Sequence, residues 1–184
     1  MERLNRRIKI SACLFLLSIC LVACSPSTNN QQPAFPELNG HWVVDNYHYL
    51  KDKTITDTDQ VFNQLQSDGI AEVAIVIQEG IKNNGPYDDE KIWARDWGRK
   101  IELGGEDDRA IVWLIRPDVE PEENRVTIEI STHLTWLVYS DYGPILEEAA
   151  DYANANDLDG SVTSITRNTD EVLRRVWKER KDLS

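Results

Sequence analysis

Cysteine is absent from most of this 184-residue chain, because Cys13, Cys20 and Cys24 all lie within the first 24 residues. The remainder therefore contains no disulfide, no cysteine-ligated zinc and no thiol nucleophile. The chain also lacks a glycine-rich phosphate loop, a nucleophile elbow and the His-Glu-x-x-His pair of zinc hydrolases, so no catalytic residue is assigned. Of its three histidines, His41 and His48 lie seven positions apart, which favours surface or packing roles over metal ligation.

Basic residues are few relative to acidic ones. The chain has 20 Lys and Arg against 32 Asp and Glu, and its formal net charge is -12. The first 23 residues carry a net charge of +3, so the remaining chain is near -15. Such a surface argues against nucleic acid or anionic lipid as a binding partner. Metal cations, basic protein surfaces and simple solubility remain as explanations.

One apolar run, at residues 10–23, follows four basic residues and is too short to span a bilayer comfortably. This layout predicts a signal peptide over residues 1–23, with an uncleaved anchor helix as the alternative. The Leu-Val-Ala-Cys tetrad at 21–24 resembles the lipobox at which a bacterial signal peptidase cuts before a lipid-modified cysteine. Cys24 is then the mature N-terminus of a lipoprotein, carries a lipid such as palmitate, and holds the protein to a membrane of the cell envelope, outside the cytoplasm.

Residues 25–36 are rich in Ser, Pro, Asn and Gln and show no apolar period. Together with Cys24 they predict a flexible linker over residues 24–36. No internal repeat or second boundary follows, and no later apolar stretch is long enough to cross a membrane. A single domain is expected over residues 37–184.

Three apolar runs predict strands. The run at residues 70–77 is dense and β-branched, as in a strand covered on both faces, and the run at 110–115 ends at Arg116 and Pro117. Alternating apolar residues predict a third strand at 126–130. A helix between the first two strands makes them parallel neighbours through a right-handed crossover, and the third pairs as an antiparallel hairpin. The pattern predicts an α/β fold with a mixed sheet covered by helices.

Two helices are expected before the hairpin. Thr56 is a candidate N-cap for a helix that ends at Gly69. Asp88 is a candidate cap for a second helix that stops at Gly104. The apolar face of this second helix consists of Ile92, Trp93, Trp97 and Ile101.

Two more helices are expected after the hairpin. The third begins at Ser140 or Gly143, has Pro144 in its first turn and ends within residues 154–160. That segment superficially resembles an EF-hand calcium loop, but alanine and threonine occupy the positions of the first ligand and of the bidentate acid. A polar turn, with an Asp capping one long terminal helix that contains Val162, is favoured instead.

Several acids end strands or lie in loops, where α/β sheets collect their functional groups. If they converge, their oxygens supply the ligands that a hard cation such as Ca²⁺ prefers. The alternative is that each acid is solvated or caps a turn. The candidate metal ligands are Asp45, Asp107, Asp108, Glu129 and Asp141.

The order of five short motifs over residues 40–176 resembles the TPM domain family, a group of exported or lumen-facing α/β domains from bacteria and thylakoids. The chain departs from the family pattern at Asp107-Asp108-Arg109, where the family has Asp-Asn-Gly, and at Ser131 and His133, where it has glycines. The resembling motifs are Val43-Val44-Asp45, Ala74-Ile75-Val76-Ile77, Trp97-Gly98, Asp107-Asp108 before Ile111-Val112-Trp113-Leu114, and Ile128-Glu129-Ile130 followed by Leu134 and Asp141.

The resemblance implies an α/β/α sandwich whose mixed sheet has four strands or a similar number. In this family an acidic groove binds Ca²⁺ or another divalent cation in some members, and acid phosphatase activity is claimed for some. We therefore expect a membrane-anchored binding or scaffold module, with a divalent cation as its cofactor and a protein of a membrane complex as its partner. The alternative is a metal-assisted acid phosphatase of low activity, in which Asp107 and Asp108 hold the cation and Asp45 orients water.

Overall fold

The computed structural model of the chain describes residues 32–82 and 89–182. The predicted signal peptide, the predicted lipidation site Cys24 and the predicted cap Asp88 lie outside these residues. The compact unit begins at Gln32, five residues before the predicted boundary at Glu37. None of the helices in the described ranges is long and apolar enough to cross a bilayer.

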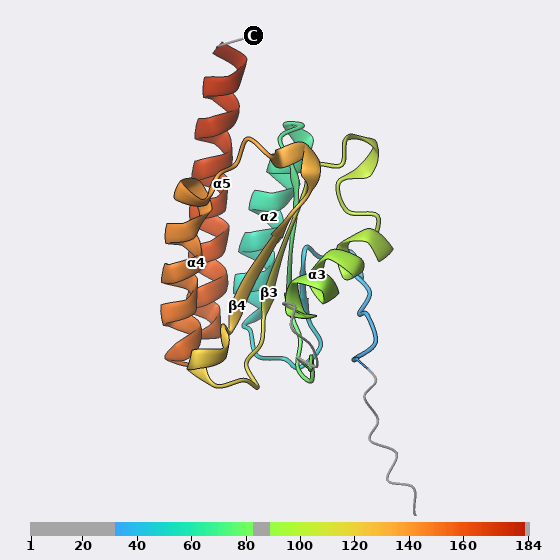
Figure 1. Cartoon of the computed structure of the whole chain (residues 1–184), viewed down its shortest axis with the longest axis vertical. Helices are drawn as coiled ribbons and strands as arrows, with labels where there is room; N and C mark the ends of the chain where they lie inside the picture. The colour runs from blue at the N-terminus through green and yellow to red at the C-terminus, as the bar shows by residue number, and fades with distance from the viewer. Residues whose placement is uncertain (1–31, 83–88, 183–184) are drawn as a thin grey trace, which may run out of the picture. The chain divides into compact units, whose positions relative to one another are not determined.

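A four-stranded mixed sheet forms the centre of the domain (Figure 1), which confirms the predicted α/β fold. Its first three strands are parallel neighbours in chain order, and the fourth is antiparallel to the third. The parallel pair and the hairpin were both expected from the sequence. The strands are β1 (Val43–Asp45), β2 (Glu72–Ile77), β3 (Ala110–Ile115) and β4 (Val126–Ile130).

Helices cover both faces of the sheet. One layer contains α2 (Asp52–Ser67), α4 (Tyr139–Asn154) and α5 (Leu158–Asp182), and α3 (Asp89–Lys100) covers the opposite face (Figure 1). Alternate residues of each strand face opposite layers. Trp113 therefore packs in the larger core under the three helices, and Leu114 packs under α3.

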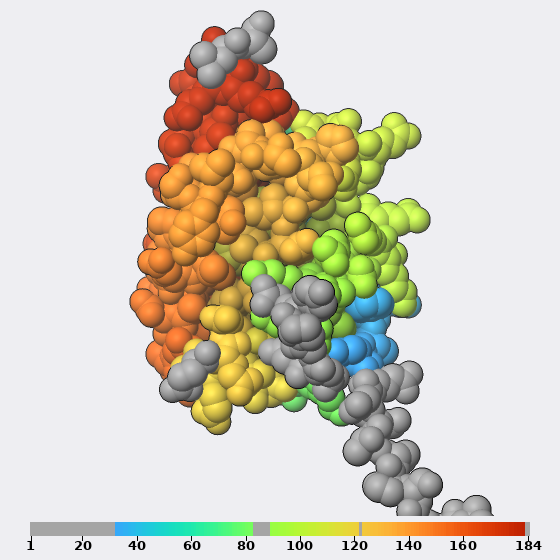
Figure 2. All heavy atoms as spheres, in the orientation of Figure 1, coloured from blue at the N-terminus to red at the C-terminus, as the bar shows by residue number. Residues whose placement is uncertain are grey.

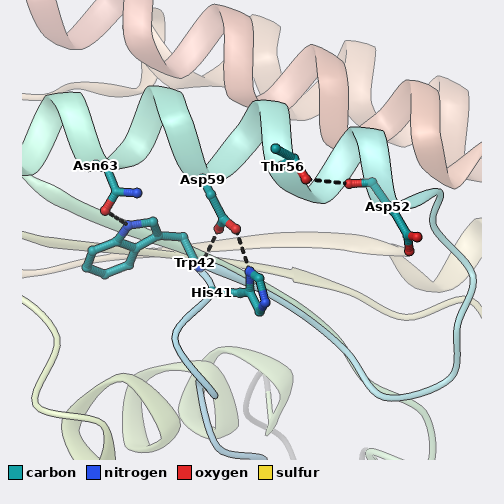
Figure 3. Close-up of polar contacts among 6 residues, drawn as sticks. All are labelled: His41, Trp42, Asp52, Thr56, Asp59 and Asn63. Atoms are coloured by element: carbon teal, nitrogen blue, oxygen red, sulfur yellow. Dashed lines mark hydrogen bonds and ion pairs between the residues drawn. The ribbon is translucent and has the colours of Figure 1, made fainter.

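Helix α2 begins at Asp52, four residues before the predicted cap Thr56. The predicted start was wrong because a contact with another helix holds the start of α2. The Asp159 carboxylate of α5 accepts hydrogen bonds from the Lys51 backbone N–H at 3.1 Å and from the Thr54 hydroxyl. The Thr56 hydroxyl instead donates to the Asp52 carbonyl inside the helix (Figure 3).

Helix α4 begins at Tyr139, so Pro144 lies inside it rather than in its first turn. The Asp141 carboxylate accepts a hydrogen bond from the Val138 backbone N–H, which starts the helix before the proline. The last helix is preceded by a polar turn and capped by an Asp, as predicted. The Asp157 carboxylate accepts from the Gly160 backbone N–H at 2.9 Å and caps α5.

Residues before Glu37 pack against α3. The Trp97 indole N–H donates to the Pro36 carbonyl at 2.8 Å, and Phe35 lies 5.2 Å from Trp93 between ring centroids. The end of the predicted linker is therefore part of the domain. On α3 itself, Ile92 is exposed, contrary to the predicted apolar face.

Candidate binding groove along strand β4

Asp45 lies at the opposite end of the sheet from the other predicted ligands. It ends β1 beside Ile77, whereas Asp107 and Asp108 precede the first residue of β3. Because the strands are parallel, these ends are separated by the length of β2, roughly 16 Å. The Asp45 carboxylate accepts backbone N–H bonds from the turn that follows, including one from Leu50 at 2.8 Å. It therefore stabilises a turn.

Asp107 and Asp108 point to different partners. Asp107 forms an ion pair with Arg109. Asp108 has a left-handed backbone (φ 45°), and its carboxylate accepts a hydrogen bond from the Thr132 hydroxyl at 3.1 Å and contacts His133 Nδ1 at 3.1 Å. The two adjacent carboxylates therefore do not form a chelating pair.

Glu129 and Asp141 are also separated from each other. Glu129 lies on the α3 face of β4, 4.0 Å from the Arg95 guanidinium, and its burial raises the pKa of its carboxyl. Asp141 caps α4 and forms an ion pair with Arg175 at 2.9 Å.

The predicted convergence of the five acids is therefore wrong. Asp108 and Glu129 share one hollow, and Asp45, Asp107 and Asp141 line three others. Among the described residues, no three His, Cys, Asp or Glu side chains are grouped so that they could hold a metal ion. Ca²⁺ takes six to eight oxygens, so the acids of the described residues do not form a Ca²⁺ site.

Replacing Glu129 by glutamine is expected to raise the melting temperature at pH 7. Its pKa is raised above the ordinary value of 4.5, so the folded state binds a proton more tightly than the unfolded state does. The stability that Glu129 contributes is present below pH 4.5 and is lost as the pH rises through the folded pKa. The difference between Glu129→Gln and wild type should shrink toward pH 4 in thermal unfolding. Exposed Glu106→Gln is the control, and a lower melting temperature for Glu129→Gln at pH 7 would show that the Arg95 contact dominates.

His41 is exposed at the surface and makes a polar contact, which agrees with the surface or packing role that the sequence favoured. The Asp59 carboxylate of α2 contacts His41 Nδ1 at 2.6 Å and accepts the Trp42 backbone N–H at 2.7 Å (Figure 3). The Trp42 indole N–H donates to Asn63 one turn further along α2. These contacts attach the segment before β1 to α2.

The outer edge of β4 has backbone groups without a partner among residues 32–82 and 89–182. The Arg125 carbonyl accepts a hydrogen bond from the backbone N–H of Arg116, which follows β3, and the Ser131 N–H donates to the Ala110 carbonyl. The backbone N–H and C=O groups of residues 125, 127, 129 and 131 therefore point toward β3. Residues 126, 128 and 130 alternate with these and direct their N–H and C=O groups away from the sheet. In the described part of the chain no hydrogen bond reaches these outward groups.

A cavity of about 540 Å³ follows this edge, between α4 and the start of α3. Figure 1 shows β4 between α4 and α3, and Figure 2 gives the same view in space-filling form, with α4 in orange and α3 in green. We call this cavity and the adjoining edge the β4 groove. Tyr139, Tyr142 and Leu146 of α4 form one wall, and Glu90 and Lys91 of α3 lie on the other.

Glu90 is a residue of this groove that the sequence did not single out. It is 5% exposed, and its Oε2 atom has no hydrogen-bond partner among the described residues. As an acid in the first turn of α3 it gains from the helix dipole. A buried carboxylate oxygen without a donor is nevertheless costly, and a cationic group that reached it would relieve this cost. The sequence did contain a signal for its burial. Glu90 lies three residues before Trp93 and seven before Trp97, which places it on the same face of the helix as these two side chains.

No protein family matches the sequence, and a search of curated proteins found no match. Solved bacterial structures share its fold. The N-terminal domain of the cg2496 protein from Corynebacterium glutamicum is 14% identical, with a TM-score of 0.52, over 78% of this chain and 88% of that one. The BA42 protein from Bizionia argentinensis is 9% identical, with a TM-score of 0.53, over 72% of this chain and 86% of that one. The N-terminal domain of a P. gingivalis protein is 18% identical, with a TM-score of 0.50, over 72% of this chain and 84% of that one. These identities show the fold alone.

Proposed function

We propose that the chain is a bacterial extracytoplasmic lipoprotein, anchored to a membrane of the cell envelope through lipid on Cys24, whose TPM-like domain binds another protein. The observation that carries the binding role is the β4 groove, which combines an unpaired strand edge, aromatic side chains and the buried Glu90 carboxylate. The sequence of residues 1–24 supports the anchor.

The metal-assisted phosphatase has less support. That mechanism needs Asp107 and Asp108 to hold a cation next to a water molecule oriented by Asp45. The strand register places Asp45 at the opposite end of the sheet, and Arg109 already pairs with Asp107. A binding module requires no such convergence.

The binding role is tested by photo-crosslinking in the bacterial envelope. A benzophenone amino acid replaces Tyr139, which is 61% exposed and lines the groove, or Tyr152, which is exposed elsewhere on α4. We expect position 139 to give one discrete crosslinked product, identified by mass spectrometry, and position 152 not to give it. No product from either position, or the same products from both, would contradict a specific partner at this groove.

A further inference from the structure

We propose that the β4 groove binds an extended, basic segment of another protein, which pairs with β4 as a fifth strand. This inference rests on the proposed binding function and adds the chemistry of the partner. Strand addition uses outward N–H and C=O groups of an edge strand for affinity and the pockets beside it for side-chain specificity.

The backbone of β4 meets the first requirement. The outward groups of residues 126, 128 and 130 are spaced every second residue along the strand, which is the repeat that an added strand satisfies. An unpaired strand edge of this kind is a template for pairing with another chain. A 3-10 helix, Pro121–Glu123, and Asn124 precede the strand, and the described edge is continuous from Val126 to Ile130.

The groove walls set the side-chain pattern of the segment. Successive side chains of an added strand point to opposite faces of the sheet. Those on the α4 side meet Tyr139, Tyr142 and Leu146, which suits apolar residues. Those on the α3 side lie toward Glu90, whose buried Oε2 lacks a donor and would accept a hydrogen bond from lysine or arginine once the Glu90 side chain turns toward the groove. The expected segment therefore alternates apolar and basic residues.

Charge supports a basic partner over a second copy of this chain. The chain has a net charge of -12, so a cationic segment is attracted to it and a like-charged protein is repelled. Glu147 also lines the groove. Of the two cations there, Arg125 already donates to the carbonyls of Val119 and Ala153, and Lys91 also has a contact of its own. A symmetric pairing of two β4 edges would bring these acidic grooves together.

The test uses the full lipidated chain in detergent micelles and a fluorescent eight-residue probe that alternates valine and lysine. Fluorescence anisotropy at 150 mM NaCl measures its dissociation constant. Glu90→Gln, which keeps the side-chain shape, is expected to weaken binding about 10- to 100-fold, because the lost contact is a charge-assisted hydrogen bond. Glu171→Gln, an exposed acid on α5 with the same charge change, is the matched control and should alter binding less than about twofold.

Two further probes separate strand pairing from charge attraction. A probe with N-methyl groups on the residues that face β4 cannot donate its backbone N–H groups and should bind at least about tenfold more weakly. A probe of valine and glutamate should not bind. Hydrogen exchange measured by mass spectrometry should slow in residues 124–131 when the valine–lysine probe is bound.

Several results would overturn the inference. One is an equal loss of probe binding in Glu90→Gln and Glu171→Gln. Another is a methylated probe that binds as tightly as the unmethylated one. A third is protection from hydrogen exchange that lies outside residues 124–131. Concentration-dependent dimers with protection of the same segment would instead identify a second copy as the occupant. If position 139 crosslinks a protein but the valine–lysine probe does not bind, the proposed function stands and this inference fails. If the probe binds but no crosslink forms in the envelope, the proposed function fails.

Discussion

Replacing Cys24 by serine is expected to abolish lipid modification and normal processing of the protein. In the proposed lipoprotein the Cys24 thiol of the tetrad at residues 21–24 is the acyl acceptor, and serine removes it. Each methylene of an acyl chain buried in the bilayer contributes about 0.8 kcal/mol, and stable anchoring requires two chains, so the variant loses its lipid anchor and keeps only the uncleaved apolar run at residues 10–23. Mass spectrometry of the N-terminal peptide from the membrane fraction measures the change.

Cys20→Ser is the matched control, because Cys20 lies inside the apolar run and before the expected cleavage site. It should leave the mature N-terminus and its lipid unchanged. A Cys24→Ser protein that is processed normally and stays membrane-bound would refute the lipoprotein assignment. That result would leave the uncleaved anchor helix as the explanation for residues 1–23.

Strands β3 and β4 were predictable to the residue, because each is an apolar pattern with clear ends. Arg116 and Pro117 stop the first, and alternation defines the second. The start of α2 was not predictable, because Asp159, which holds the backbone N–H of Lys51, is 108 residues away in the chain. Local patterns identify elements, whereas contacts between distant elements fix where some of them begin.

The candidate site was harder to predict than the fold. Acids beside strands are visible in the sequence, but the end of the sheet at which each lies depends on strand direction and on whether it precedes or follows its strand. Asp45 ends β1 and Asp108 precedes β3, so parallel strands place them at opposite ends. The unpaired edge of β4 was hidden because the side-chain pattern of a strand does not identify its neighbours. Glu90 was hidden because an acid in a first helical turn usually serves the helix dipole.

The second large effect is expected from Trp97→Ala, which should lower the free energy of unfolding by about 3 to 5 kcal/mol. Trp97 of α3 is fully buried in the core between this helix and the sheet. Its ring stacks with that of Trp93, and the two ring centroids are 6.3 Å apart. Alanine leaves a cavity and removes the indole N–H that the Pro36 carbonyl accepts. For a domain of this size the melting temperature should fall by roughly 6 to 20 °C, measured by calorimetry.

Trp97→Phe separates the two contributions to this effect. Phenylalanine keeps most of the aromatic packing but cannot donate to Pro36, so the loss should be smaller, about 1 to 2 kcal/mol for the hydrogen bond and the partial cavity. Because that bond attaches the residues that precede Glu37 to α3, hydrogen exchange in residues 33–38 should accelerate in Trp97→Phe before the rest of the domain changes. Unchanged exchange in this segment would show that the packing of Phe35 on Trp93 holds it without the hydrogen bond. A loss below about 1 kcal/mol in Trp97→Ala would contradict the placement of Trp97 in the core between α3 and the sheet.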